Sequence, residues 1–210
     1  ETGQELFSVV ETTGCCWRMF HGCFGDCMRW SADVVYTGYG QQVHIMRMER
    51  PASFACCCFN RPVMRIKDAQ TGMELGSVRD PWTCCNIAFT VRDEQENDIV
   101  TANGGCCQWG LCCPLPCGPC AVVQLQLQDA RSGENIGMLT KKVPGILKFL
   151  FTPDVDNYHV DFMNPPVWNG KKKALMMALA LFMDFRMFHS NSINVTSMCV
   201  QSALCSGGDE

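Results

Sequence analysis

The sequence predicts a mainly β protein whose short antiparallel strands surround one hydrophobic helix near the C-terminus. Three observations predict this class: stretches of alternating apolar and polar residues, a strand-and-hairpin unit that recurs, and one nearly uninterrupted apolar segment. With 210 residues, 47% hydrophobic and 18% charged, the chain can bury a core of its own. No Pro-, Gly- or Ser-rich linker separates the recurring units, so we expect one domain over residues 1–190 and a flexible tail over residues 191–210.

Two predicted hairpins repeat one pattern at an offset of 61 residues, which brings Asp68 onto Asp129. The segments "VMRIKDAQTGMELGSV" and "VVQLQLQDARSGENIGML" both alternate, carry a Thr-Gly or Ser-Gly turn and alternate again. Another alternating stretch precedes each hairpin, at residues 42–49 and 98–103, and a fainter copy of the unit occupies residues 6–46. Short antiparallel strands that share one core predict either a sandwich or a closed barrel.

One apolar helix is expected at residues 172–189. Thirteen of the fifteen residues in 174–188 are apolar and none is Gly or Pro, so the helix is either buried in protein or inserted in lipid. It would be about 22 Å long, short of the roughly 30 Å hydrocarbon core. Asp184 and Arg186 would cost about 5–7 kcal/mol in lipid, against about 3–6 kcal/mol gained from the apolar residues. We therefore expect a helix buried among strands. Its predicted core side chains are Leu175, Leu179, Phe182 and Phe185.

The seventeen cysteines come in adjacent runs, and we expect most of them to be reduced. Disulfide scaffolds are typical of short chains that lack a core, and neighbouring cysteines along an extended chain point apart. A second use is open for the cluster at residues 106–120, because four thiolates could hold a tetrahedral zinc ion. The cluster consists of Cys106, Cys107, Cys112, Cys113, Cys117 and Cys120. Cys117 and Cys120 have the C-x-x-C spacing of redox enzymes but lack the βαβ context of those enzymes. The simplest alternative to a zinc or redox site is a set of buried, unreactive thiols.

Charge and motifs exclude several function classes. The formal net charge is -4, which gives no electrostatic footprint for a polyphosphate partner, so no nucleic acid is expected. The histidines have no nucleophile–base spacing, and the chain contains no G-x-S-x-G segment or Walker loop. The sequence therefore does not predict an enzyme.

Five stretches, in this order along the chain, together resemble the phospholipid scramblase family. They are "GQELFSVVETTGCC", "GQQVHIMRMERPASFACCC", "GPCAVVQLQLQD", "FTPDVDNYHVDF" and "ALMMALALFMDFRMFHS". The likeness covers nearly all of residues 3–190, although the family's opening strands have no counterpart here. It implies a tubby-like fold, a closed antiparallel β-barrel of about 12 strands around a central hydrophobic C-terminal helix.

The resemblance also implies a function. It implies a protein on the cytoplasmic face of a membrane that moves phospholipids between leaflets in both directions when calcium is present, with oligomers left open. A cysteine run of the family is palmitoylated, and the matching residues are Cys56, Cys57 and Cys58, although Phe59, Asn60 and Arg61 replace its second half. Each CH₂ of an acyl chain buried in lipid contributes about 0.8 kcal/mol, so two or more chains anchor stably. The cluster at 106–120 could be a second lipidated segment.

The acidic segment implies low-affinity calcium binding by Asp154, Asp156 and Asp161, because Ca²⁺ prefers carboxylate oxygens. Pro165 stands where the family has a closing aspartate, which weakens this expectation. Lys171 to Lys173 either face anionic lipid headgroups or form a solvated helix start. Two other functions stay open: a lipid- or protein-binding module without transport, and a Cys-rich zinc-binding structural protein.

Overall fold

In the computed structural model the chain forms one antiparallel sheet around one long helix. The structure describes residues 7–13, 29–38, 41–53, 60–83, 86–105, 107–108, 110, 118–142, 157–163 and 165–187. Its strands are β1 (Phe7–Glu11), β2 (Trp30–Gly38), β3 (Gln41–Arg50), β4 (Val63–Asp68), β5 (Glu74–Arg79), β6 (Asn86–Arg92), β7 (Asp98–Gly105), β8 (Val122–Asp129), β9 (Asn135–Lys142) and β10 (Asn157–Phe162). Its helices are the 3₁₀ turns η2 (Gly118–Ala121) and η3 (Pro165–Val167) and the α-helix α4 (Gly170–Met187).

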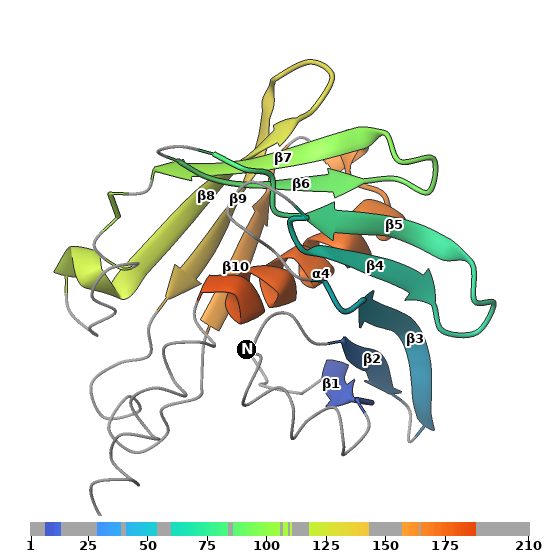
Figure 1. Ribbon diagram of the computed structural model, residues 1–210. Helices are drawn as coiled ribbons and strands as arrows, with labels where there is room; N and C mark the ends of the chain where they lie inside the picture. Colours follow the sequence, from blue (N-terminus) through green and yellow to red (C-terminus); the bar gives the residue numbers. More distant parts are fainter. Residues whose placement is uncertain are drawn as a thin grey trace, which may run out of the picture.

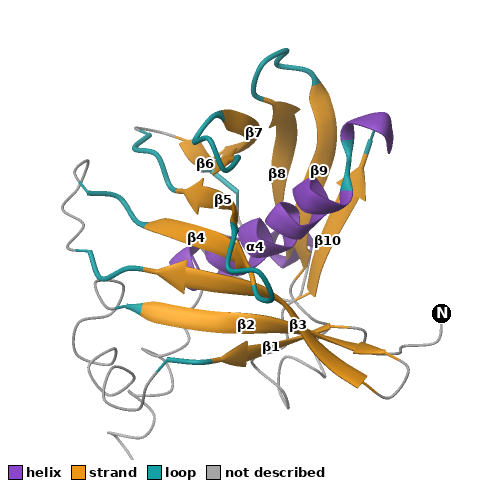
Figure 2. Ribbon diagram, turned by 90° about the vertical axis from the view of Figure 1, so that its right-hand side faces the viewer, coloured by secondary structure: helices purple, strands orange, loops and turns teal. Residues whose placement is uncertain are grey.

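The ten described strands pair in the order of the sequence, each antiparallel to its neighbour. The sheet curves around α4, with β4 and β5 on one side of the helix and β8 to β10 on the other (Figures 1 and 2). A mainly β fold with a C-terminal helix is therefore confirmed. The predicted closure is not: among the described strands no pairing joins β1 to β10, so the sheet is not closed, and a total of about 12 strands is not confirmed either.

The alternation of apolar and polar residues decides which face of each strand meets the helix. In β8, Val123, Leu125 and Leu127 are at most 2% exposed, whereas Gln124 and Gln126 between them are exposed. Side chains two residues apart on a strand share one face, so the apolar set lines the concave side of the sheet. Leu125 and Leu127 belong, with side chains of the other strands and of α4, to one continuous core.

The two repeated hairpins, β4–β5 and β8–β9, are confirmed and share their turn chemistry. The aspartate that ends the first strand, Asp68 or Asp129, accepts hydrogen bonds through Oδ1 from the backbone N–H groups two and three residues later, at 2.7–3.1 Å. The turn glycine, Gly72 or Gly133, has a φ of 70° or 72° and donates its N–H to the carbonyl of the same aspartate. A side chain tolerates that backbone poorly, so both turns need glycine.

A second pair of equivalent glycines lets the strands approach closely. A Cβ on Gly76 in β5 would collide with the backbone oxygen of Arg92 in β6, and one on Gly137 in β9 would collide with that of Asp161 in β10. These positions are again 61 residues apart, so the repeat extends beyond the turns into the sheet. Close strand approach of this kind is one use of glycine within a strand.

The helix α4 is wrapped by the sheet on several sides. It begins at Gly170, two residues before the predicted start, because Asn169 caps it: the Asn169 Oδ1 accepts a hydrogen bond from the backbone N–H of Lys172 at 2.8 Å. Leu175, Leu179 and Phe182 are at most 1% exposed. Phe185 is half-buried and packs against Trp30, with the two rings tilted by 55° and their centroids 4.2 Å apart. The predicted last residues, 188–189, and the tail lie outside the described residues.

Two strands were not predicted from the sequence. The segment 157–162, read there as an acidic loop, forms β10, in which Tyr158 and Val160 pack against the core while His159 and Asp161 are exposed. The other is β6, which carries buried Phe89. Each segment does alternate, but the strand is stable only because β9, or β5 and β7, supply hydrogen-bonding partners.

Candidate functional site

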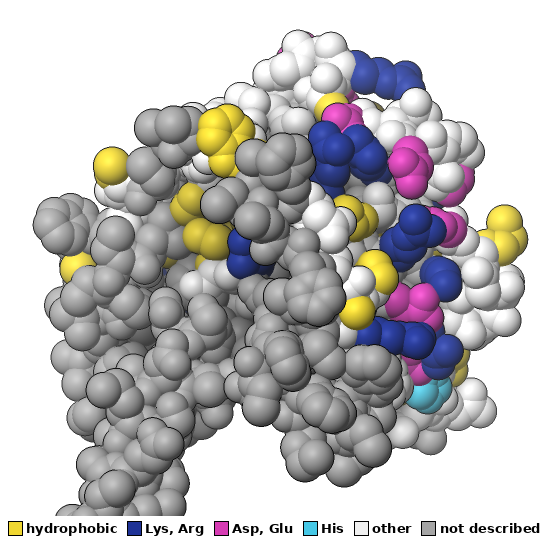
Figure 3. Space-filling model, in the orientation of Figure 1, with side chains coloured by type: hydrophobic (Ala, Val, Ile, Leu, Met, Phe, Trp, Pro, Cys, Tyr) yellow, Lys and Arg dark blue, Asp and Glu magenta, His cyan; other side chains and the backbone are white. Residues whose placement is uncertain are grey.

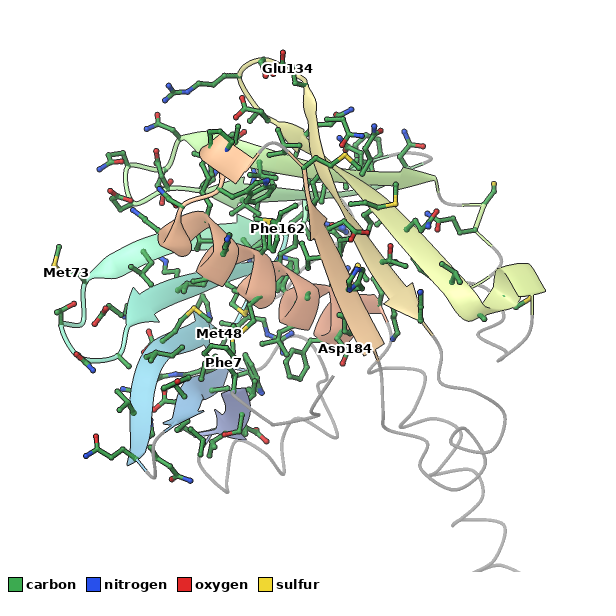
Figure 4. All side chains as sticks on the ribbon, turned by 180° about the vertical axis from the view of Figure 1, so that it is seen from behind. Phe7, Met48, Met73, Glu134, Phe162 and Asp184 are labelled. Atoms are coloured by element: carbon green, nitrogen blue, oxygen red, sulfur yellow. The ribbon has the colours of Figure 1, made fainter. Side chains whose placement is uncertain are left out.

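Because every strand pairs with the next, the connections fall at two ends of the sheet. We call the hairpin end the one with the turns β2–β3, β4–β5, β6–β7 and β8–β9 and the start of α4, and the cysteine end the opposite one. Figure 1 shows the β4–β5, β6–β7 and β8–β9 turns along the upper and right-hand rim, away from the last turn of α4. In Figure 4, Met73 and Glu134 mark hairpin turns and Asp184 marks the other end of the helix.

The cysteine runs fall in four connections whose flanking strands all end at the cysteine end. Apart from Cys199 and Cys205 in the tail, every cysteine lies between β1 and β2, β3 and β4, β5 and β6, or β7 and β8. The predicted lipidation residues Cys56, Cys57 and Cys58 lie outside the described residues. So do Cys106, Cys112, Cys113 and Cys117 of the second cluster. Cys107 is exposed, and Cys120 is half-buried in η2, directly before β8.

The three aspartates predicted to bind calcium are not placed together by the described residues. Asp154 and Asp156 lie outside them, in the β9–β10 connection. Asp161 is exposed in β10, and its Oδ1 lies 2.8 Å from Nε2 of His159. A strand rises about 3.3 Å per residue, so Asp161 is about 13 Å along β10 from Asn157, toward the hairpin end. Within the described part of the chain, no group of three or more His, Cys, Asp and Glu side chains could hold a metal ion.

Near its end, α4 carries two charged residues, Asp184 and Arg186, that are paired with the sheet at the cysteine end. Lys141 in β9 has a side chain only 3% exposed, and its Nζ lies 3.2 Å from Oδ1 of Asp184. The Tyr158 hydroxyl in β10 donates a hydrogen bond to the same oxygen at 2.7 Å, and the ammonium of Lys141 lies 5.5 Å from the centre of the Tyr158 ring. The unfavourable charge that the sequence places in an apolar helix is therefore neutralised by protein.

A second ionic contact holds the other side of the same helical turn. The Arg186 Nε donates to Oδ2 of Asp80, just after β5, at 2.8 Å, and Arg61, just before β4, pairs with the same carboxylate. Asp80 is 7% exposed. Neither Asp80 nor Arg61 was identified from the sequence, and neither were Lys141 and Tyr158. The sequence did indicate that such partners exist, because an acid and a base within an apolar helix need partners wherever they are buried.

The convex face of the sheet carries cross-strand ion pairs. In Figure 3 basic and acidic side chains are interspersed on the right-hand side of the molecule. Asp33 of β2 is nearly buried, and Arg47 of β3 donates to both of its oxygens, at 2.7 and 3.0 Å. These hydrogen bonds from Arg47, despite the opposing effect of burial, hold the pKa of Asp33 below its ordinary value. Mixed charges of this kind give the face no strong field of one sign.

The lysines that begin α4 lie at the hairpin end and already have acidic or aromatic neighbours. Lys171 pairs with Glu94, and Nζ of Lys173 lies 5.5 Å from the centre of the Phe162 ring. Lys172 lines an open pocket of about 230 Å³ with Ile99, Asp129 and Arg131. This pocket is smaller than a typical small-molecule site, which measures roughly 300–1,000 Å³. The sequence left two alternatives for these lysines, contact with anionic lipid headgroups or a solvated helix start. The observed contacts agree better with a solvated helix start.

None of the described helices is long and apolar enough to cross a membrane.

Comparison with known proteins gives one consistent result. A family model described as Scramblase matches residues 1–190. The chain is 28% identical over 187 residues to phospholipid scramblase 2 of Bos taurus, covering 89% of this chain and 58% of the relative. It is 28% identical over 189 residues to phospholipid scramblase 1 of Homo sapiens, covering 90% and 54%, and 28% identical over 147 residues to human phospholipid scramblase 4, covering 69% and 41%.

The chain thus spans little more than half the length of the first two relatives. No solved structure matches it. Because the family model covers the whole of the described sheet and helix, the chain belongs to the scramblase family.

Proposed function

We propose that this chain is a membrane-associated, phospholipid scramblase-like protein that acts on the cytoplasmic face. In this proposal it promotes calcium-dependent movement of phospholipids between leaflets in both directions and breaks no covalent bond. The observation that carries the proposal is the match of the scramblase model to residues 1–190. The relatives named phospholipid scramblase support the substrate class.

The proposed anchor consists of acyl chains on Cys56, Cys57 and Cys58, with the cluster at 106–120 as a second candidate. Support comes from the strands on either side of these segments, which all end at the cysteine end, so chains attached there would enter one lipid surface. Mass spectrometry of the protein taken from cells tests this, because each acyl chain adds a defined mass. Replacement of all three cysteines by alanine should lower the membrane-bound fraction, whereas replacement of Cys199 and Cys205 should not.

The proposed calcium ligands are Asp154 and Asp156, with Asp161 as a third candidate. Since Asp161 lies along β10 and beside His159, we expect it to contribute less than the other two. Calcium titration of the wild-type chain and of the Asp154→Asn/Asp156→Asn variant should show weaker binding in the variant, and Asp161→Asn provides the comparison. Equal calcium affinity in all three proteins would contradict this part of the proposal.

Transport is tested directly with purified protein in vesicles that contain fluorescent phospholipids. Calcium-stimulated loss of leaflet asymmetry, absent from protein-free vesicles, is the expected result. Two observations favour a second candidate function, a lipid- or protein-binding module without transport: α4 is packed inside the sheet, and the two charges near its end, Asp184 and Arg186, are paired with protein. Binding of vesicles without any lipid movement would support this module.

A third candidate is a structural protein with zinc at the 106–120 cluster. Thiol counting before and after chelation addresses it, because zinc shields its thiolates from the reagent. A count of reactive thiols in the folded protein that stays the same with and without chelator, together with no zinc in the purified protein by metal analysis, would reject this candidate.

A further inference from the structure

We propose that the cysteine end of the sheet is the face that docks on an anionic lipid surface, with the indole of Trp82 in the membrane interface. This inference rests on the proposed membrane association. It adds the orientation of the sheet on the membrane and the side chains that set it.

Trp82 is the first observation. It follows β5 by three residues, at the cysteine end, and is 58% exposed, whereas Trp30 and Trp168 are each 6% exposed and belong to the core. Tryptophan is enriched where membranes meet water, because its ring is apolar and its N–H remains hydrogen-bonded. An exposed indole at this end therefore fits a lipid interface.

The distribution of charge is the second observation. Around the described strand ends and the last turn of α4, the cysteine end has seven basic side chains against four acidic ones. The basic ones are Arg29, Arg50, Arg61, Arg79, Lys141, Lys142 and Arg186, and the acidic ones are Glu11, Glu49, Asp80 and Asp184. Such an excess among the described side chains favours attraction to a surface of anionic headgroups even where individual charges are paired, because their summed charge is positive.

The hairpin end has the opposite balance. Its described turns and strand ends, with the first turn of α4, carry six basic and nine acidic side chains. The basic ones are Lys67, Arg92, Arg131, Lys171, Lys172 and Lys173, and the acidic ones are Asp68, Glu74, Asp93, Glu94, Glu96, Asp98, Asp129, Glu134 and Asp161. An anionic surface would repel this end.

The two ends are too far apart to touch one flat bilayer together. The 18 residues of α4 run from the hairpin end to the cysteine end, a length of about 27 Å. Electrostatic attraction falls off over a Debye length of about 8 Å at physiological salt. The lysines that begin α4 therefore add little once the cysteine end is docked, and Lys171 is in any case paired with Glu94.

Two pairs of variants test this orientation, because each pair makes a comparable change in charge or in exposed apolar surface at opposite ends. Arg29→Gln/Lys142→Gln and Lys172→Gln/Lys173→Gln each remove two positive charges, and Arg29 and Lys142 are both exposed. Trp82→Ala and Met73→Ala each remove one exposed apolar side chain, Met73 being 70% exposed at a hairpin turn. Partitioning of the full chain, reduced and without acyl chains, is measured on phosphatidylserine-containing vesicles and on pure phosphatidylcholine vesicles.

We expect the wild-type chain to prefer the phosphatidylserine vesicles and to lose binding as salt rises. Arg29→Gln/Lys142→Gln should weaken this binding about fivefold per charge removed, and Lys172→Gln/Lys173→Gln should change it by less than about twofold. Trp82→Ala should weaken it about tenfold, and Met73→Ala should leave it unchanged. Brominated lipid should quench wild-type tryptophan fluorescence more than that of Trp82→Phe, which keeps the other indoles.

Larger losses in the two hairpin-end variants, or equal losses at both ends, would overturn the proposed docking face while membrane association itself stands. Failure of the wild-type chain to bind either kind of vesicle would overturn both the docking face and its membrane-binding premise. Urea unfolding of each variant identifies any loss of binding that comes from unfolding. If Trp82→Ala proves unfolded, Trp82→Phe tests the position in its place, because this variant retains an aromatic ring. The difference in quenching between it and the wild-type chain then shows whether Trp82 contacts lipid.

Discussion

At the scale of single residues, charged side chains near the core are tolerated because each meets a partner on another element. Asp184 meets Lys141 and Tyr158, and Arg186 meets Asp80. Removing one partner from a buried pair leaves the other charge without compensation, which costs more than the pair contributes. These contacts therefore fix the position of the helix end more than they add to net stability.

The Asp184→Asn substitution should lower the free energy of unfolding by about 2 kcal/mol, because the nearly buried Lys141 ammonium loses its carboxylate. Urea unfolding measures the change. Asp161→Asn serves as the control, since its pair with His159 is solvent-exposed and should contribute less than about 1 kcal/mol. In the double variant Lys141→Met/Asp184→Asn, part of the lost stability should return. A double variant less stable than Asp184→Asn alone would contradict this account.

The paired carboxylate of Asp33 should make stability depend on pH in the acid range. Hydrogen bonds from Arg47 hold its pKa in the folded protein below the unfolded value of about 3.9. The ionised group thus stabilises the fold above the unfolded pKa, and this contribution is lost as the pH falls through the folded pKa. In urea unfolding, wild type should exceed Asp33→Asn in stability near pH 7, and the difference should shrink below about pH 4. A difference that grows on acidification would refute the assignment.

At the scale of elements, the repeat of 61 residues is a repeat of backbone geometry. Both long hairpins use an aspartate to accept two turn N–H groups and a glycine to reverse the chain. In each second strand a further glycine lets the next strand approach. Two supersecondary units of the same construction can share one core because their apolar faces both turn toward α4.

Alanine at the close-approach glycines should be the most disruptive of the glycine substitutions. Gly76→Ala and Gly137→Ala would press a methyl group against the backbone of the neighbouring strand, at a cost of about 2–3 kcal/mol in urea unfolding. Gly133→Ala should cost about 1–2 kcal/mol, since its positive φ is strained but the space is open. Gly105→Ala has open space and no positive φ, so it should be nearly neutral. An equal cost at Gly105 and Gly137 would argue against close strand approach.

At the scale of the whole molecule, the sheet provides the surroundings that the helix needs. Phe182 is 1% exposed and meets Phe89 of β6 edge to face, with ring centroids 5.9 Å apart. The concave side of the sheet is therefore filled by α4. Lipid contacts, in the proposed function, are consequently made at the surface.

Replacing Phe182 by alanine should destabilise the protein by about 3–5 kcal/mol in water without any lipid, because it leaves a cavity between α4 and the sheet. Urea unfolding in the absence and presence of vesicles measures the change. Leu181→Ala is the comparison, since that side chain is only partly buried and should cost less. Unchanged stability in water, with a loss seen only when lipid is present, would mean that the helix packs against lipid instead.

The sequence was sufficient wherever a short-range pattern determines the structure. Alternation predicted both long hairpins and the strands at 42–49 and 98–103, and the apolar run predicted α4 to within two residues of its start. Composition alone did not reveal β6 or β10, because a short alternating segment becomes a strand only when neighbours supply hydrogen bonds. The resemblance of five stretches to phospholipid scramblases predicted the family, and the family model confirms this prediction.

The sequence by itself thus determined the local units, namely the strands and hairpins, and the apolar helix that follows them. These follow from periodicity and turn chemistry. Tertiary structure alone decided which side chains share a surface. Lys141 contacts Asp184, which is 43 residues away in the sequence, and Arg186 contacts Asp80, which is 106 residues away. It also brought the flanks of four separate cysteine runs to one end of the sheet, because each strand returns antiparallel to the one before it. These long-range contacts depend on how the whole sheet curves around the helix, which no local sequence pattern specifies.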